Sequence, residues 1–181
     1  MNAKINRRVM RRARRGLSLA EVLISLAIST FLLVAVAAAY TASADAVEMN
    51  DKFFRATQAG RVTMNQLLTE IRRADEVAVF ADHIEIFRPV QNRLPNEFTR
   101  TYKYDAANKQ MKLQISYLPP AAPSPWYSLA RNVEQATFGP AEMDPTPPSR
   151  VLRVPVTLVV KIGNNEVRLS GSSGPRRAAK E

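Results

Sequence analysis

A run of 23 residues without a charged side chain, residues 22–44, constrains the fold of this chain more than any other feature of its sequence. It reads VLISLAISTFLLVAVAAAYTASA, and as one helix it would be roughly 35 Å long. About 20 apolar residues suffice to cross the hydrocarbon core of a bilayer. No second segment is apolar enough to surround this one, so the run predicts a membrane-spanning helix rather than the buried helix of a soluble protein.

The positive charge of the chain is concentrated just before this run. The 181 residues include 26 Lys and Arg against 16 Asp and Glu, a net charge of +10. Seven of the basic residues and none of the acidic ones lie in residues 1–16, which leaves 19 basic against 16 acidic beyond them. By the positive-inside rule, this asymmetry predicts a cytoplasmic N-terminus. It also argues against a basic, nucleic-acid-binding surface on the rest of the chain.

The helix is predicted to continue beyond the apolar run, to about residue 74. No proline precedes Pro89, and apolar residues recur at steps of three and four, as on one face of an amphipathic helix. The residues expected on this face are Phe53, Phe54, Thr57, Met64, Leu67, Leu68 and Ile71. Such a face packs on a globular domain.

Beyond this helix the hydrophobic period changes to two, as in β-strands. Strands are expected at 76–80, 83–87, 99–104, 109–117, 151–162 and 166–169. Pro155 favours an edge strand in the last hairpin, and the segment 129–138 fits a short helix or a strand. The predicted fold class is therefore α+β, with a long N-terminal helix, membrane-spanning in its first half and amphipathic in its second, packed on an antiparallel β-sheet domain.

The residues at which the basic leader meets the apolar run read RRGLSLAEVL. Their one carboxylate, Glu21, would cost about 2.5–3.5 kcal/mol at the centre of a membrane helix, so it lies near the headgroups or requires a cationic partner. Cleavage after Gly16 would supply such a partner, because it creates an α-ammonium group on Leu17.

This junction resembles the processing motif of the type IV pilin-like family, which comprises type IV pilins and the pseudopilins of type II secretion. The motif is a basic leader ending in glycine, then a hydrophobic residue, Ser or Thr, Leu, any residue and Glu, and it is met by Gly16, Leu17, Ser18, Leu19, Ala20 and Glu21. The resemblance implies that a prepilin peptidase cuts after Gly16 and N-methylates Leu17, the two predicted processing residues. It also implies that Glu21 pairs with the Leu17 amine of a neighbouring subunit, so Glu21 and Leu17 are the predicted assembly residues.

The rest of the chain resembles a J-type minor pseudopilin, or a related minor type IV pilin, in looser patterns: LLTEIRRA, TRTYKY, SLARNVEQATF and VPVTLVV. The resemblance implies a structural subunit, assembled from the inner membrane into a type II secretion pseudopilus or a type IV pilus. Its partners would be the prepilin peptidase, other pilin subunits and the membrane, with the globular domain in the periplasm. The expected segments are a leader at 1–16, a transmembrane and assembly helix at 17–44, a pilin-like domain at 45–169 and a disordered tail at 170–181.

Two other functions fit parts of the sequence. Ala42, Ser43 and Ala44 form an A-x-A-like site, so the N-terminus could be a signal peptide cut near Asp45 that releases a soluble periplasmic domain. The length of the apolar run and the presence of Glu21 argue against this. A minor pilin for DNA uptake is the second alternative, and the small net charge beyond the leader argues against it.

The remaining polar residues do not predict a catalytic, cofactor or metal site. The chain has no cysteine and one histidine, which excludes thiolate chemistry and Cys-ligated metals. An acidic cluster comprises Asp75, Glu76, Asp82, His83 and Glu85. Strand alternation would place Asp82 on the face opposite His83 and Glu85, so no metal is predicted there. Ser124 and Ser128 have no base nearby in the sequence, and the pair Trp126 and Tyr127 is expected to anchor the core rather than to bind a partner.

The processing motif makes a direct prediction about the mature protein. Mass spectrometry is expected to find N-methyl-Leu17 as its first residue, and replacement of Gly16 by leucine is expected to block the cut, because a larger side chain does not fit a cleft made for glycine. A mature N-terminus near Asp45 would contradict this and support the signal peptide.

Overall fold

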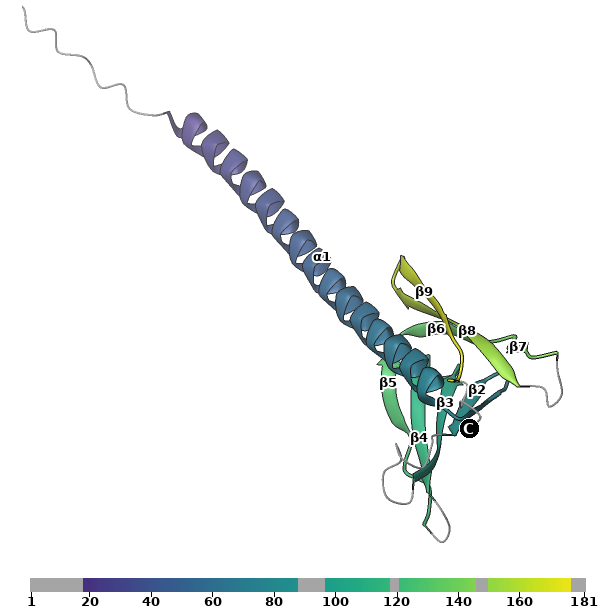
Figure 1. The fold of residues 1–181 in the computed structure, drawn as a ribbon. Coiled ribbons are helices and arrows are strands. Elements are labelled where there is room, and N and C mark those ends of the chain that lie inside the picture. The colour runs from purple at the N-terminus through teal and green to yellow at the C-terminus, as the bar shows by residue number, and fades with distance from the viewer. Residues whose placement is uncertain (1–17, 88–96, 118–120, 146–149, 177–181) are drawn as a thin grey trace, which may run out of the picture. The chain divides into compact units, whose positions relative to one another are not determined.

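The computed structural model describes residues 18–87, 97–117, 121–145 and 150–176. In these ranges one helix precedes a series of antiparallel strands (Figure 1). The elements are α1 (Leu19–Arg73), β1 (Glu76–Val79), β2 (His83–Phe87), β3 (Glu97–Asp105), β4 (Gln110–Tyr117), β5 (Tyr127–Arg131), β6 (Val133–Phe138), β7 (Glu142–Met143), β8 (Val151–Ile162) and β9 (Asn165–Ser173). The predicted α+β fold class, one long N-terminal helix with antiparallel sheets, is confirmed.

The chain divides into two compact units, Met1–Ala46 and Val47–Glu181. The described part of the first unit consists of the apolar half of α1, in which every residue is exposed. An 18-residue window of α1 has a mean hydropathy of 2.6, and α1 is the one helix of the described ranges that is long and apolar enough to cross a membrane. The prediction of a helix with the length and composition of a membrane span is therefore confirmed.

The second unit contains two antiparallel sheets. The first has five strands in the order β1-β2-β3-β4-β5. In the second, β8 is the central strand, pairing with β6 and β7 along one edge and with β9 along the other. The first sheet is a meander of consecutive strands, whose register places Ile84 of β2 opposite Tyr102 of β3, and Tyr102 opposite Leu113 of β4.

One hydrophobic core joins the second half of α1 to both sheets. The buried face of the helix follows steps of three and four residues through Thr57, Gly60, Met64, Leu67 and Ile71. Its partners in the core are Ile84, Ile86, Tyr102, Met111, Leu113, Ala130, Val133, Ala136, Phe138, Val154, Val156 and Leu158. The expectation that Phe54 belongs to this face is wrong, because its side chain is 68% exposed, whereas the neighbouring Phe53 is half-buried.

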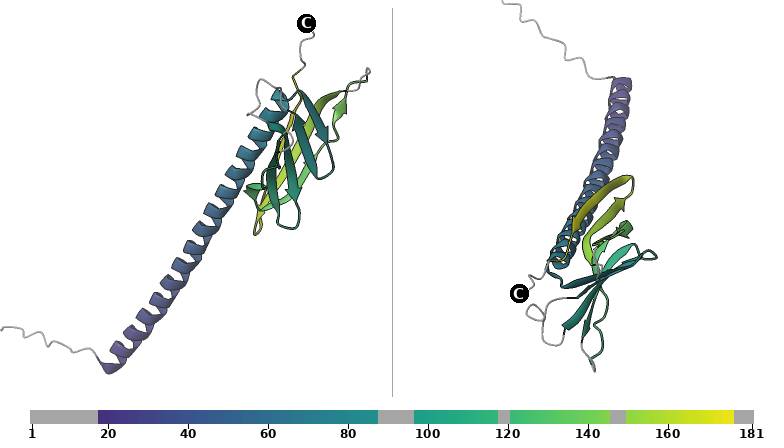
Figure 2. Two further views of the ribbon diagram at one scale, coloured as in Figure 1. Left: turned by 90° about the horizontal axis from the view of Figure 1, so that it is seen from below. Right: turned by 45° about the vertical axis from the view of Figure 1, so that its right-hand side comes forward.

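The β8–β9 hairpin packs along α1, and glycines provide the space. A Cβ atom on Gly60 would lie 3.0 Å from Cγ2 of Val160 and 3.1 Å from Cδ1 of Leu169. Gly171 of β9 approaches α1 so closely that its Cβ would lie 2.6 Å from Cδ1 of Leu68. Figure 2 shows the hairpin beside the helix. β9 extends to Ser173, and the packing of Gly171 on α1 holds its last residues. The predicted disordered tail, 170–181, is therefore corrected, because its first four residues belong to a strand.

The segment 129–138, for which the sequence left helix and strand open, forms parts of two strands in different sheets. Asn132 separates β5 from β6 with a φ of 59°, a left-handed conformation that asparagine tolerates better than most residues. Its carbonyl accepts a hydrogen bond from the Lys161 amide at 3.0 Å. Asn132 therefore transfers the chain from the first sheet to the second.

The last hairpin has one edge strand, as Pro155 had suggested, but that strand is β9 and not β8, which carries Pro155. β8 has neighbours on both sides. The Pro155 carbonyl accepts a hydrogen bond from the Gly139 amide at 2.8 Å, and the N and C=O of a strand residue point to the same side. The Pro155 nitrogen therefore faces residues 139–141, which lie between β6 and β7. No strand pairs with β8 there, so the missing N–H of proline leaves no hydrogen bond of the sheet unmade.

A nearly buried ion pair joins α1 to β3. Nη1 of Arg100 donates to Oε1 of Glu70 at 2.6 Å, and the two side chains are only 15% and 8% exposed. The fully buried Tyr102 lies beside them, and burial together with the Glu70 carboxylate raises the pKa of its hydroxyl. The pair links α1 to the five-stranded sheet beside the apolar contacts of the core.

A chain shortened to begin at Asp45 is expected to fold alone as a mixed helix–sheet monomer, because the second unit begins at Val47 and contains the whole core. Circular dichroism and thermal unfolding measure this directly. A disordered spectrum without a cooperative transition would contradict the prediction.

Replacement of Arg100 by leucine in this shortened chain is expected to lower the free energy of unfolding by about 3–5 kcal/mol, since it leaves the Glu70 carboxylate buried without its cation. Lys109→Leu is the control, because the Lys109–Glu134 pair is exposed and such pairs contribute about 0–1 kcal/mol. Urea titration measures both changes, and equal effects would show that burial of the Glu70 pair carries no special weight.

Candidate functional site

The first turn of α1 is closed by two motif residues that bond to each other. The Ser18 amide donates to Oε2 of Glu21 at 2.8 Å, and the Glu21 amide donates to Oγ of Ser18 at 3.2 Å. The Val22 amide donates to the Ser18 carbonyl at 3.2 Å, which is the first bond of the helix. This reciprocal arrangement is a capping box, with Ser18 as the N-cap and Glu21 as the third helical residue.

The cap determines what the Glu21 carboxylate can still bind. It lies at the N-terminal end of the helix, where the partial positive charge of the free amides favours an anion. Oε2 is used by the Ser18 amide, whereas Oε1 accepts no hydrogen bond from any residue in the described ranges. Glu21 is thus held in place by its own helix while one carboxylate oxygen is available to a cation.

From the sequence, Glu21 was expected either to lie near the headgroups or to require a cationic partner. The structure shows a further role, because its carboxylate caps the first turn of α1. The signal was present, because serine followed three residues later by glutamate ahead of an apolar run is the capping-box pattern. Gly16 and Leu17, the predicted processing residues, lie outside the described residues. Their roles, and the pairing of Glu21 with Leu17, remain predictions.

The helix beyond the cap has the surface that lipid requires. Its large apolar side chains from Leu19 to Tyr40 are between 52% and 81% exposed, so no face of this half is covered. The polar side chains bond within the helix: Ser25 to the Glu21 carbonyl, Ser29 to Ser25, Thr30 to Ala27, Thr41 to Ala38 and Ser43 to Ala39, at 2.7–2.9 Å. Every serine and threonine hydroxyl of the apolar run therefore has an internal acceptor, as a segment without water as a partner needs.

The comparisons with known proteins agree with this site. The family model described as the prokaryotic N-terminal methylation motif matches residues 11–37, a range that includes the end of the basic leader, Gly16, Leu17 and the capped helix start. This match supports the resemblance of the N-terminal segment to the type IV pilin-like family. Comparison with curated proteins and with solved structures gave no match, so the likeness of the chain to known proteins rests on its N-terminal segment.

Part of the acidic cluster of the globular unit, Asp82 and His83, forms a polar network with Lys103 in the structure. Asp82 and His83 are brought together, contrary to the strand alternation expected from the sequence, because Asp82 lies in the bend before β2. Oδ1 of Asp82 lies 2.7 Å from Nδ1 of His83, and Oδ2 lies 3.3 Å from Nζ of Lys103. These two partners lower the pKa of Asp82. Within the described ranges, no group of three or more His, Asp or Glu side chains is arranged to hold a metal ion.

The other polar and aromatic candidates have different environments. Ser124 is buried, and its Oγ accepts from the Ile115 amide at 2.9 Å and donates to the Pro125 carbonyl at 3.0 Å, which ties Ser124 to β4. The expectation that Trp126 and Tyr127 anchor the core is wrong, since they are 40% and 48% exposed. Tyr127 begins β5 and Trp126 precedes it, and β5 lies at the edge of its sheet with one neighbouring strand.

Replacement of Ser18 by alanine is expected to accelerate amide hydrogen exchange of Glu21 in the full chain in detergent micelles. Loss of an N-cap hydroxyl costs about 0.5–2 kcal/mol, and one to two kcal/mol corresponds to a factor of about 5–30. Ser18→Thr keeps the acceptor and should restore slow exchange. Ser25→Ala is the matched control, because the Ser25 hydroxyl donates to a carbonyl within the helix and does not accept from a free amide. If Ser25→Ala accelerates exchange of the Glu21 amide as much as Ser18→Ala does, the capping role is contradicted.

Proposed function

We propose that this chain is a structural subunit, a minor pseudopilin or minor pilin, that is held in the inner membrane and assembled into a pseudopilus or pilus. The observation that carries the proposal is the junction itself: a prepilin-type motif leads, through a capped first turn, into an apolar helix whose entire surface is exposed. A surface of this kind needs lipid or other apolar helices around it. The proposed role is mechanical and needs no catalytic residue.

In the proposed topology, the basic leader remains in the cytoplasm and the unit beginning at Val47 lies on the periplasmic side. The concentration of basic residues before the helix supports this orientation. A prepilin peptidase would cut between Gly16 and Leu17 and methylate the new amine. Assembly then moves the apolar helix from lipid into a bundle of like helices, so its surface stays out of water throughout.

Glu21 has the proposed task of setting the axial register between subunits. Its Oε1 would accept from the Leu17 ammonium of a neighbouring subunit, while Oε2 keeps the cap on its own helix. In surroundings of low dielectric constant, a carboxylate left without its cation is destabilised by several kcal/mol. A subunit in the wrong register therefore carries an uncompensated charge, and a subunit in the right one does not.

The two alternatives lead to different outcomes. A cleaved signal peptide would separate the soluble unit from the apolar helix near Asp45, so that the mature protein would contain no membrane span. A DNA-uptake pilin would share the N-terminal assembly and differ in the globular surface, where three basic side chains, Lys103, Lys109 and Lys112, are paired with carboxylates.

The experiment that tests the proposal is substitution of Glu21 in the full chain. Glu21→Gln is expected to leave membrane insertion and peptidase cleavage largely intact, because these depend on the apolar run and on Gly16. Incorporation into a multi-subunit complex is expected to fall at least about tenfold, since the amide keeps the shape and the cap acceptor and lacks the charge for the ion pair. Co-purification of partner pilins from detergent-solubilised membranes measures assembly, and cleavage is read on the same samples.

Glu21→Asp serves as the control that keeps the charge on a shorter side chain, and it should assemble better than Glu21→Gln. If Glu21→Gln assembles like the unaltered chain, the register role is wrong and the residue serves only its own helix. If cleavage fails together with assembly, the carboxylate acts first in recognition by the peptidase.

A further inference from the structure

The outer edge of β5 is open. β5 is the last strand of the five-stranded sheet, and in the described part of the chain it pairs with β4 alone. The chain leaves it at Asn132, whose left-handed backbone ends the strand and directs the next residues into the other sheet. The backbone groups on the free side of β5 can therefore pair with a further strand, as those of any exposed sheet edge can.

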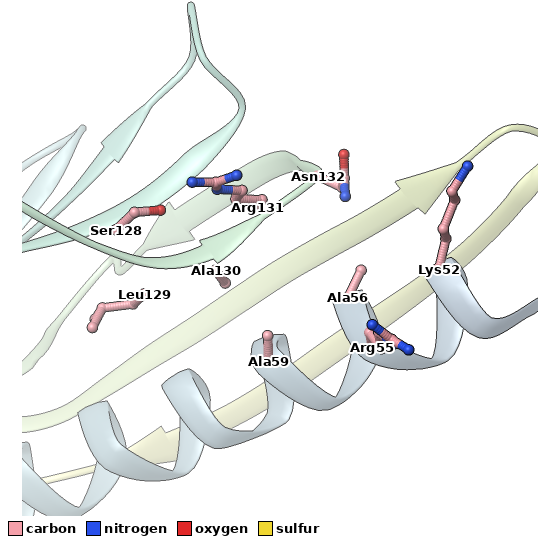
Figure 3. A pocket seen from close by; sticks show the side chains of 9 residues that line it. All are labelled: Lys52, Arg55, Ala56, Ala59, Ser128, Leu129, Ala130, Arg131 and Asn132. Atoms are coloured by element: carbon pink, nitrogen blue, oxygen red, sulfur yellow. The ribbon is translucent and has the colours of Figure 1, made fainter. Parts of the chain in front are cut away.

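A groove of about 410 Å³ follows this open edge, with α1 as its other wall (Figure 3). On the strand side, it is lined by the five consecutive residues from Ser128 to Asn132. Successive side chains of a strand point to opposite faces, so a groove on one face would be lined by alternate residues. Lining by consecutive residues places this groove along the edge of the strand.

The helix wall of the groove carries two small side chains. Ala56 and Ala59 face it with the smallest side chains that a helix ordinarily carries, and Ala130 on the strand is equally small. The groove is thus bounded by a strand edge and by a helix face that does not close over it. An added strand would lie about 4.8 Å from β5.

The charge of the groove has one sign. Its nine lining residues include Lys52, Arg55 and Arg131 and no carboxylate. Lys52 and Arg55 form exposed pairs with Glu48 and Asp51, four residues earlier on the same helix, and pairs of this kind contribute only about 0.3–0.5 kcal/mol. They can be exchanged for another carboxylate at little cost. Arg131 is exposed at the end of β5.

We propose that this edge and groove bind an extended, acidic segment of another protein by β-strand addition. Main-chain hydrogen bonds to β5 would hold the segment, and its Asp or Glu side chains would face Lys52, Arg55 and Arg131. Trp126 and Tyr127, both exposed at the start of the strand, extend the contact surface beyond the groove. The surface belongs to the globular unit, so the inference goes beyond the filament role and its test does not depend on processing or assembly.

Trp126 makes the proposal measurable, because it is the single tryptophan of the chain. The full chain in detergent micelles is titrated with an acetylated and amidated peptide of about six residues, in which glutamate alternates with valine and threonine, while tryptophan fluorescence is recorded. A saturable change is expected. The same peptide with N-methyl groups on alternate residues keeps its charge, loses strand donors, and is expected to bind at least about tenfold more weakly.

Arg131→Glu is expected to weaken binding of the unmodified peptide by about tenfold or more, without a change in the circular-dichroism melt, because the side chain is exposed. Arg168→Glu is the matched control, an equal change of charge at an exposed residue of β9 outside the groove. Binding that survives N-methylation, or that responds equally to both substitutions, would overturn strand addition at this site. Absence of peptide binding combined with self-association that Arg131→Glu abolishes would overturn it in favour of a second copy of the chain.

Discussion

The fold depends on one constraint: the first half of α1 presents an apolar surface on every side. No other described segment of the chain covers it, and the serine and threonine hydroxyls of its apolar run bond to carbonyls of the same helix. This half is therefore soluble only in lipid or among similar helices. The second half of the same element meets the opposite requirement, because one face carries the core and the other carries charges in water. One uninterrupted helix therefore has a first half suited to apolar surroundings and a second half suited to contact with both a protein core and water.

Within the globular unit, the packing of α1 is defined from two sides. The Glu70–Arg100 pair and the fully buried Tyr102 fix it on the five-stranded sheet. On the other side, Gly60 and Gly171 let the β8–β9 hairpin approach the helix to a distance that side chains would prevent. These contacts leave β5 as an edge that neither the hairpin nor a further strand of the described chain pairs with.

Much of this architecture could be predicted from the sequence, because hydrophobic periodicity reports which face of an element is buried. The end of α1 was expected near residue 74 and lies at Arg73, and the first and last hairpins were placed correctly. The errors concern features that periodicity does not encode. Phe54 is apolar like a core residue, but its side chain is exposed on α1. Trp126 is exposed because it lies next to β5 at the edge of a sheet, and the order of the strands is decided only by the tertiary fold. At the N-terminus, the capping box could have been predicted from the spacing of Ser18 and Glu21, because serine followed three residues later by glutamate is its pattern.

The course of the last hairpin determines how the globular unit responds to tension. The β8–β9 turn at Gly163 contacts Met49, Leu169 contacts the helix at Gly60, Gly171 contacts Leu68, and the Arg176 amide donates to the Arg72 carbonyl at 3.1 Å. The contacts are thus spread along the helix from residue 49 to residue 72. A pull along the helix axis loads them together in shear, instead of opening them one after another as a perpendicular pull would. The glycines that permit close packing therefore also make the hairpin a mechanical brace for the helix.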